Sequence, residues 1–84
     1  MEINILGAGC TNCNTLEKLT REVVEKNNID ATVTKVEDFI EIMKLGVMTT
    51  PALVVDGQVL VKGRVPSVAE IKQLLLDRIQ KKRD

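Results

Sequence analysis

The sequence of residues 2–13 is EINILGAGCTNC, and this stretch sets the first strand and the start of the first helix. β-branched residues are frequent at positions 2–6, which predicts a strand, and the glycines that follow predict a turn. From Cys13 onward the apolar residues recur at helical spacing, at Leu16, Leu19, Val23 and Val24. The pair Cys10 and Cys13 is therefore predicted to lie where a strand gives way to a helix.

The middle of the chain predicts a second strand and a short helix. Residues 31–36 are rich in β-branched side chains, which favours a strand. Asp38, with Glu41 three residues later, has the spacing of a helix N-cap and its reciprocal partner. The helix that follows is expected to end at Gly46 and to bury Phe39, Ile40 and Met43.

The last third predicts a hairpin and a long helix. An apolar run over residues 51–55 stops at Asp56-Gly57, a typical two-residue hairpin turn, and residues 58–62 form the returning strand. Ser67 with Glu70 has the spacing of a capping box. The helix that it opens is expected to bury the stripe Val68, Ile71, Leu75 and Ile79.

These elements predict an α/β fold of the order β-α-β-α-β-β-α. The first β-α-β unit requires two parallel strands, and the hairpin adds an antiparallel one. The result is a mixed four-stranded sheet flanked by three helices. Because 84 residues leave room for one modest core, we expect residues 1–84 to form a single domain.

Composition excludes several classes of function. Twelve basic residues balance twelve acidic ones, and a single Phe is the only aromatic residue, so we expect no nucleic-acid partner. The chain has no His, which excludes Ser-His and Cys-His hydrolases. No apolar run is long enough for a membrane span, and no signal peptide is recognisable, so we expect a cytoplasmic monomer that contacts no membrane.

The placement of Cys10 and Cys13 predicts thiol chemistry. A helix N-terminus offers unpaired backbone N–H groups and the positive end of the helix dipole, and both favour a thiolate at Cys10. Cys13, one turn into the helix, is expected to be more buried. A purely structural disulfide is disfavoured because so short a loop yields only about 2 kcal/mol. Two unrelated core cysteines are disfavoured by the glycine turn just before them.

A soft-metal site is the main alternative. Gly7-x-Gly9-Cys10-x-x-Cys13 superficially resembles the motif of heavy-metal-associated copper chaperones, and two thiolates suit Cu(I). Those domains have the order βαββαβ and usually carry Met two residues before the first cysteine, where this chain has Ala8. Structural zinc is disfavoured because it usually needs four protein ligands. We therefore expect no resident metal and no cofactor.

A second segment strengthens the redox interpretation. Residues 46–57, GVMTTPALVVDG, resemble the cis-proline segment of thioredoxins and glutaredoxins, and the whole chain looks like the small thioredoxin-like redox-active disulfide proteins. The resemblance implies a redox-active disulfide between Cys10, the nucleophile, and Cys13, the resolving residue. It also implies a cis Thr50–Pro51 bond facing the cysteines, where an extended substrate segment pairs with the backbone of Thr50.

The sequence departs from the thioredoxin pattern in three places. Thioredoxin has Trp before the first cysteine and Gly-Pro between the two, where this chain has Gly9 and Thr11-Asn12. Asn4 stands where thioredoxin has a buried Asp. Because an amide does not accept a proton at neutral pH, water or another carboxylate has to take the proton of the resolving thiol.

The sequence therefore predicts a thiol–disulfide oxidoreductase that works without a cofactor. Its expected partners are protein disulfide substrates and an electron donor that resembles thioredoxin reductase.

Overall fold

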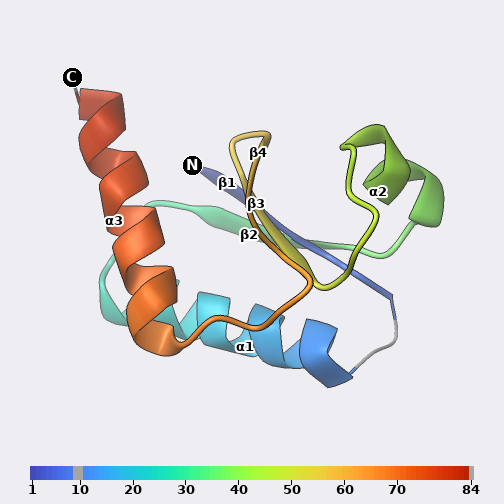
Figure 1. Ribbon diagram of the computed structural model, residues 1–84. Helices are drawn as coiled ribbons and strands as arrows, with labels where there is room; N and C mark the ends of the chain where they lie inside the picture. The colour runs from blue at the N-terminus through green and yellow to red at the C-terminus, as the bar shows by residue number, and fades with distance from the viewer. Residues whose placement is uncertain (9–10, 84) are drawn as a thin grey trace.

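The computed structural model describes residues 1–8 and 11–83, together with the side chains of residues 1–8 and 11–80. The elements are β1 (Glu2–Leu6), α1 (Thr11–Lys26), β2 (Thr32–Val36), α2 (Phe39–Lys44), β3 (Ala52–Val55), β4 (Gln58–Lys62) and α3 (Val68–Arg83). Figure 1 shows α1 and α3 on one side of the sheet and α2 on the other. The predicted α/β class and element order are confirmed.

The strands lie in the order β2-β1-β3-β4. β1 is parallel to β2 and antiparallel to β3, and β3 is antiparallel to β4. Parallel pairing of β1 and β2 requires a crossover, which α1 provides. The turn between β3 and β4 is formed by Asp56 and Gly57, whose φ angles of 49° and 82° fit a type I′ hairpin.

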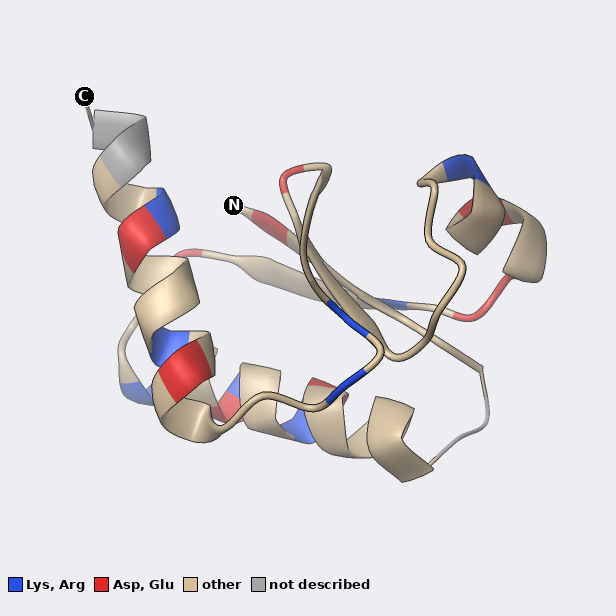
Figure 2. Cartoon of the chain, viewed as in Figure 1, with Lys and Arg blue, Asp and Glu red and all other residues tan. Residues whose placement is uncertain are grey.

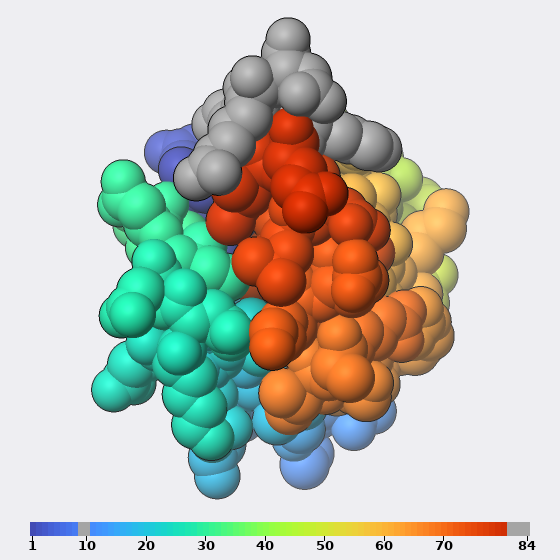
Figure 3. Space-filling model, turned by 90° about the vertical axis from the view of Figure 1, so that its left-hand side faces the viewer, coloured from blue at the N-terminus to red at the C-terminus, as the bar shows by residue number. Residues whose placement is uncertain are grey.

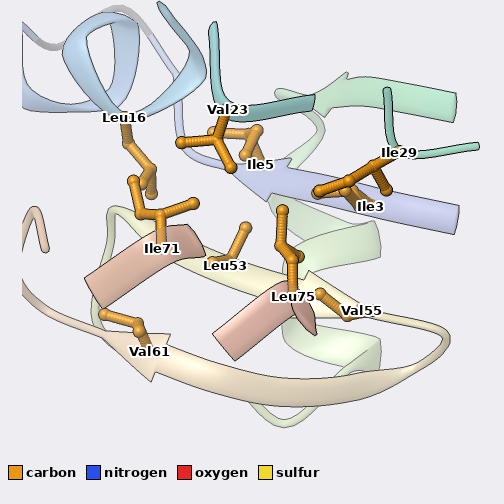
Figure 4. Packing of buried hydrophobic residues seen from close by; sticks show 10 residues of the cluster. All are labelled: Ile3, Ile5, Leu16, Val23, Ile29, Leu53, Val55, Val61, Ile71 and Leu75. Carbon is orange, nitrogen blue, oxygen red and sulfur yellow. The ribbon is translucent and has the colours of Figure 1, made fainter. Parts of the chain in front are cut away.

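The larger of two apolar clusters lies between the sheet and the pair α1 and α3. Leu16 and Val23 of α1 meet Ile71 and Leu75 of α3 over the inward side chains of the sheet (Figure 4). All four are almost completely buried, and burial of such a side chain stabilises the fold by about 1.5–3 kcal/mol. Figure 3 shows α3 lying along the outside of this layer, beside the segment that links α1 to β2.

The smaller cluster lies under α2 on the other face of the sheet. It consists of Leu6, Ile42, Val47, Ala52 and Val54. Alternation along β1 produces the two clusters, since successive side chains of a strand point to opposite faces. A six-residue helix covers little of a four-stranded sheet, so this face is the more open one.

Helices α1 and α2 end in the same hydrogen-bonded motif. Asn28, with φ of 49°, follows α1, and the N–H of Ile29 donates to the carbonyl of Val24 at 3.0 Å. Gly46, with φ of 76°, follows α2, and the N–H of the next residue, Val47, donates to the carbonyl of Ile42 at 3.4 Å. A residue with left-handed conformation at this position is the mark of a Schellman-type end.

The predicted N-caps Asp38 and Ser67 are present, but the prediction that Glu41 and Glu70 are their reciprocal partners is wrong. Asp38 Oδ1 accepts from the N–H of Ile40 at 2.8 Å, and Ser67 Oγ accepts from the N–H of Glu70 at 3.2 Å. The carboxylates of Glu41 and Glu70 pair instead with Lys44 and Arg64. A charge-assisted hydrogen bond to a nearby cation is stronger than one to a neutral amide.

The predicted buried face of α2 is also wrong. Phe39, Ile40 and Met43 are 72%, 63% and 51% exposed, and the helix reaches the sheet through Ile42 instead. The end of α2 explains why Ile42 faces the sheet. The N–H of Val47 donates to the carbonyl of Ile42 at 3.4 Å, and both side chains are buried in the cluster under α2.

The predicted stripe of α3 needs one correction. Ile71 and Leu75 are buried, and Ile79 is partly buried against the same cluster. Val68 is exposed because it is the first residue of the helix and lies before the turn that contacts the sheet.

Candidate functional site

The candidate site lies where β1 ends and α1 begins. Cys13 is in the first turn of α1, its side chain is completely buried, and its sulfur takes part in a disulfide. Cys10, the predicted nucleophile and disulfide partner, lies outside the described residues. Its role and its pairing with Cys13 therefore stay predictions.

Gly7 links Cys13 to the segment around Thr50. Its φ is 147°, and its N–H donates to the carbonyl of Val36 at 3.0 Å, which holds the end of β1 against β2. A Cβ added at Gly7 would lie 2.2 Å from Cys13 Sγ and 3.6 Å from Thr50 Cβ. The sulfur therefore occupies the space that a side chain at Gly7 would need, and Thr50 lies close to the same place.

The Thr50–Pro51 peptide bond is cis, the isomer that the resemblance implies. Pro51 is buried at the start of β3, and its carbonyl accepts a hydrogen bond from the N–H of Gly63 at 2.9 Å. Thr50 is exposed beside the buried sulfur of Cys13. Substrate binding by Thr50 and Pro51 stays a prediction, but their placement next to one of the two cysteines is what that role requires.

A groove next to Thr50 is a feature that the sequence did not predict. Its volume is about 310 Å³, and it is lined by Ala8, Glu37, Phe39, Ile42, Met43, Val47, Met48 and Thr50. The sequence pattern predicts instead that Phe39 and Met43 are buried in the core. The sequence does contain a sign of the groove, because the only Phe of the chain and two of its three Met lie within residues 39–48.

Lys35 is a second feature that the sequence did not indicate. Its ammonium donates to Asn14 Oδ1 in the first turn of α1 and lies 4.0 Å from Glu17 Oε1 and 3.8 Å from Glu37 Oε1. The side chain is mostly buried, so it ties β2 to the helix that carries Cys13. A partly buried ion pair of this kind is screened less by salt than a surface pair.

Asn4 lies in the middle of β1, in register with Thr34 of β2 and Val54 of β3. Its neighbours Ile3 and Ile5 point into the cluster under α1 and α3, so the side chain of Asn4 is on the opposite face of the sheet. Asn4 is partly buried there.

Acidic and basic residues are interspersed over the described part of the chain (Figure 2). Within that part, no group of three or more His, Cys, Asp or Glu side chains is placed to hold a metal ion. None of the helices described is long and apolar enough to cross a membrane.

Comparison with known proteins extends these observations. Residues 1–76 match the thioredoxin domain family. A protein named thioredoxin from Methanothermobacter thermautotrophicus is 44% identical over 75 residues, which cover 89% of this chain and 97% of that protein. Another thioredoxin, from Methanocaldococcus jannaschii, is 38% identical over 80 residues, which cover 95% of this chain and 92% of that protein. Since the matches run through the whole arrangement of β1, Gly7, Cys13 and the cis-proline, the chain belongs to the thioredoxin family.

Proposed function

We propose that this protein is a thiol–disulfide oxidoreductase that reduces disulfides in other proteins. One observation carries the proposal: a completely buried cysteine in the first turn of a helix lies next to an exposed Thr50 and a cis-proline, in a chain of the thioredoxin family. We further propose that residues 1–84 form one thioredoxin-like domain, which works as a cytoplasmic monomer.

The reaction has two thiol–disulfide exchange steps. The thiolate of Cys10 attacks a substrate disulfide, which forms a mixed disulfide and releases the first substrate thiol. The thiolate of Cys13 then attacks the sulfur of Cys10, which releases the second substrate thiol and leaves the Cys10–Cys13 disulfide. Two electrons and two protons pass from the protein dithiol to the substrate, and a reductase similar to thioredoxin reductase returns the protein to its dithiol form.

The surroundings of Cys13 suit the resolving role. A completely buried sulfur is shielded from other disulfides in solution, so it reacts with the neighbouring mixed disulfide rather than with a new substrate. Thr50 is exposed, and its backbone pairs with an extended substrate segment and holds it next to the cysteines. The reaction needs no cofactor.

The two cysteines are tested separately. Cys10→Ser is expected to abolish insulin reduction, whereas Cys13→Ser is expected to accumulate covalent complexes with substrates because the mixed disulfide is not resolved. A variant with both substitutions controls for complexes that form without a thiol. Turnover that persists in Cys10→Ser, or faster alkylation of Cys13 than of Cys10 at neutral pH, would contradict the assigned roles.

The soft-metal alternative is not supported. The elements follow the order β-α-β-α-β-β-α, whereas heavy-metal-associated domains have the order βαββαβ. The comparisons match thioredoxins over nearly the whole chain.

A further inference from the structure

Strand β2 lies at one edge of the sheet. In the strand order β2-β1-β3-β4, its single neighbour among the described strands is β1. The N–H of Thr32 donates to the carbonyl of Met1 at 2.9 Å, and residues 32, 34 and 36 bond the neighbouring strand because a parallel ladder uses alternate residues. The N–H and C=O groups of Val33 and Lys35 therefore point away from β1. These two residues form the free hydrogen-bonding edge of β2.

The composition of β2 favours pairing with a further strand. Its sequence is TVTKV, in which every residue except Lys35 is β-branched, and Thr32 and Thr34 are exposed. Lys35 does not shield the edge, because its ammonium donates to Asn14 of α1 and its side chain is mostly buried. An exposed edge of this kind is a template for a strand from another molecule.

A second copy of β2 fits this edge in the antiparallel direction. With a two-fold axis at Thr34, Val33 of each copy lies opposite Lys35 of the other, and both of these pairs exchange two backbone hydrogen bonds. Thr34 then lies opposite Thr34 of the second copy, and a Thr–Thr pair across two strands is favourable. Half of the hydrogen bonds of this arrangement end on the carbonyl oxygens of the two Val33 residues.

Arg21 of α1 already occupies the carbonyl of Val33. Its Nη2 donates to that oxygen at 3.2 Å, and its Nε and Nη2 donate to Glu17 Oε2 at 3.3 Å and 3.1 Å. The other oxygen of Glu17 lies 4.0 Å from Lys35 Nζ. Because the guanidinium is planar and bonded to two groups at once, it is held in a fixed orientation over the outer edge of β2. A second strand would need the same place.

The opposite edge of the sheet is protected in a different way. The register between β3 and β4 shifts after Leu53, so Leu60 of β4 falls outside the regular pairing. Lys62, at the end of β4, is exposed. An irregular register and an exposed Lys both discourage pairing with a further strand. The register between β2 and β1 is continuous, so protection of the β2 edge depends on a side chain from α1.

We propose that Arg21 closes the outer edge of β2 and thereby prevents the protein from pairing with a second copy of itself. The edge is an interaction surface, and the partner that it fits once Arg21 is removed is β2 of a second copy. This inference rests on the proposed monomer and is independent of the thiol chemistry.

Sedimentation equilibrium over a wide range of protein concentration tests the role of Arg21. Arg21→Ala frees both Val33 carbonyls, and two hydrogen bonds of typical net strength correspond to a dimer that is about thirtyfold tighter than that of the unsubstituted protein. Lys18→Ala is the matched control, because it removes the same charge from an exposed position on the same helix. Equal association of the two variants, or no association of either, would overturn the inference.

A second pair of variants tests the geometry of the dimer. In the Arg21→Ala background, Thr34→Glu places two carboxylates directly opposite each other and should dissociate the dimer. Thr32→Glu adds the same charge at another exposed position of β2, opposite Val36 of the second copy, and should leave most of the dimer intact. A dimer that survives Thr34→Glu, or that both substitutions dissociate equally, would refute pairing through β2.

Further measurements keep the inference separate from the proposed function. A dimer of the unsubstituted protein would refute both the proposed monomer and the inference, whereas monomers of this protein and of Arg21→Ala would refute the inference alone. Far-ultraviolet circular dichroism shows whether Arg21→Ala is folded. If it is not, Glu17→Gln takes its place, because this variant loosens the guanidinium without removing it and should promote the same dimer to a smaller extent. A monomeric Glu17→Gln protein would then overturn the inference.

Discussion

Gly7→Ala is the most informative single substitution because it probes the contact between the end of β1 and Cys13. The added Cβ would lie 2.2 Å from Cys13 Sγ and 3.1 Å from Cys13 Cβ, whereas ordinary contact begins at 3.4 Å. Either the sulfur or the backbone of Gly7 has to move by about an ångström, and forced overpacking of this kind costs about 1–3 kcal/mol. The positive φ of 147° adds backbone strain of about 1–3 kcal/mol. We therefore expect the free energy of unfolding to fall by about 2–6 kcal/mol.

Gly57→Ala is the matched control. Gly57 also has a positive φ, 82°, but a Cβ added there meets no atom within 4 Å. Replacing Gly57 by Ala therefore costs only the backbone strain, about 1–2 kcal/mol of the free energy of unfolding. The difference between the two variants isolates the contact with the sulfur.

The assay is urea denaturation followed by far-ultraviolet circular dichroism, since the chain has no Trp or Tyr to report by fluorescence. All proteins are compared in the reduced state, so that a double-mutant cycle with Cys13→Ala is possible. Removal of the sulfur should recover a large part of the cost of Gly7→Ala. A cost of Gly7→Ala no larger than that of Gly57→Ala, or no recovery in the double variant, would refute the close approach of Gly7 to the sulfur.

Three further predictions concern the rest of the fold. Asn28→Gly should raise the free energy of unfolding by up to about 1 kcal/mol in the same assay, because Asn28 has a φ of 49° that glycine adopts without strain; a loss of stability would contradict this. Ile71→Ala should lower it by about 2–5 kcal/mol, whereas Val68→Ala, on the same helix but exposed, should change it by less than about 0.5 kcal/mol; equal losses would restore the stripe expected from the sequence. A hydrogen bond from Arg64 holds the pKa of Glu70 below its usual range, so the carboxylate stabilises the fold above the pKa of the unfolded chain, and this contribution disappears as the pH falls through the folded pKa. Glu70→Gln should therefore lower the melting temperature slightly at neutral pH and not in acid; the same loss at both pH values would show that the ion pair is not its cause.

The sequence was sufficient for features that depend on neighbouring residues. The turn Asp56-Gly57 and the caps Asp38 and Ser67 are local, because their conformations and hydrogen bonds involve residues a few positions apart. The order of strands and helices follows from local periodicity in the same way. The candidate residues Cys13, Thr50 and Pro51 were also recognisable, because their motifs are short and contiguous.

The tertiary structure alone decided which residues meet. The buried face of α2 depends on how the end of the helix packs Val47 against the sheet, so periodicity within six residues could not predict that Phe39 and Met43 are exposed. Gly7 and Thr50, which are distant in the chain, lie close together. This proximity arises only when the sheet brings the end of β1 beside the start of β3, because local propensity carries no information about the partner of a residue across the fold.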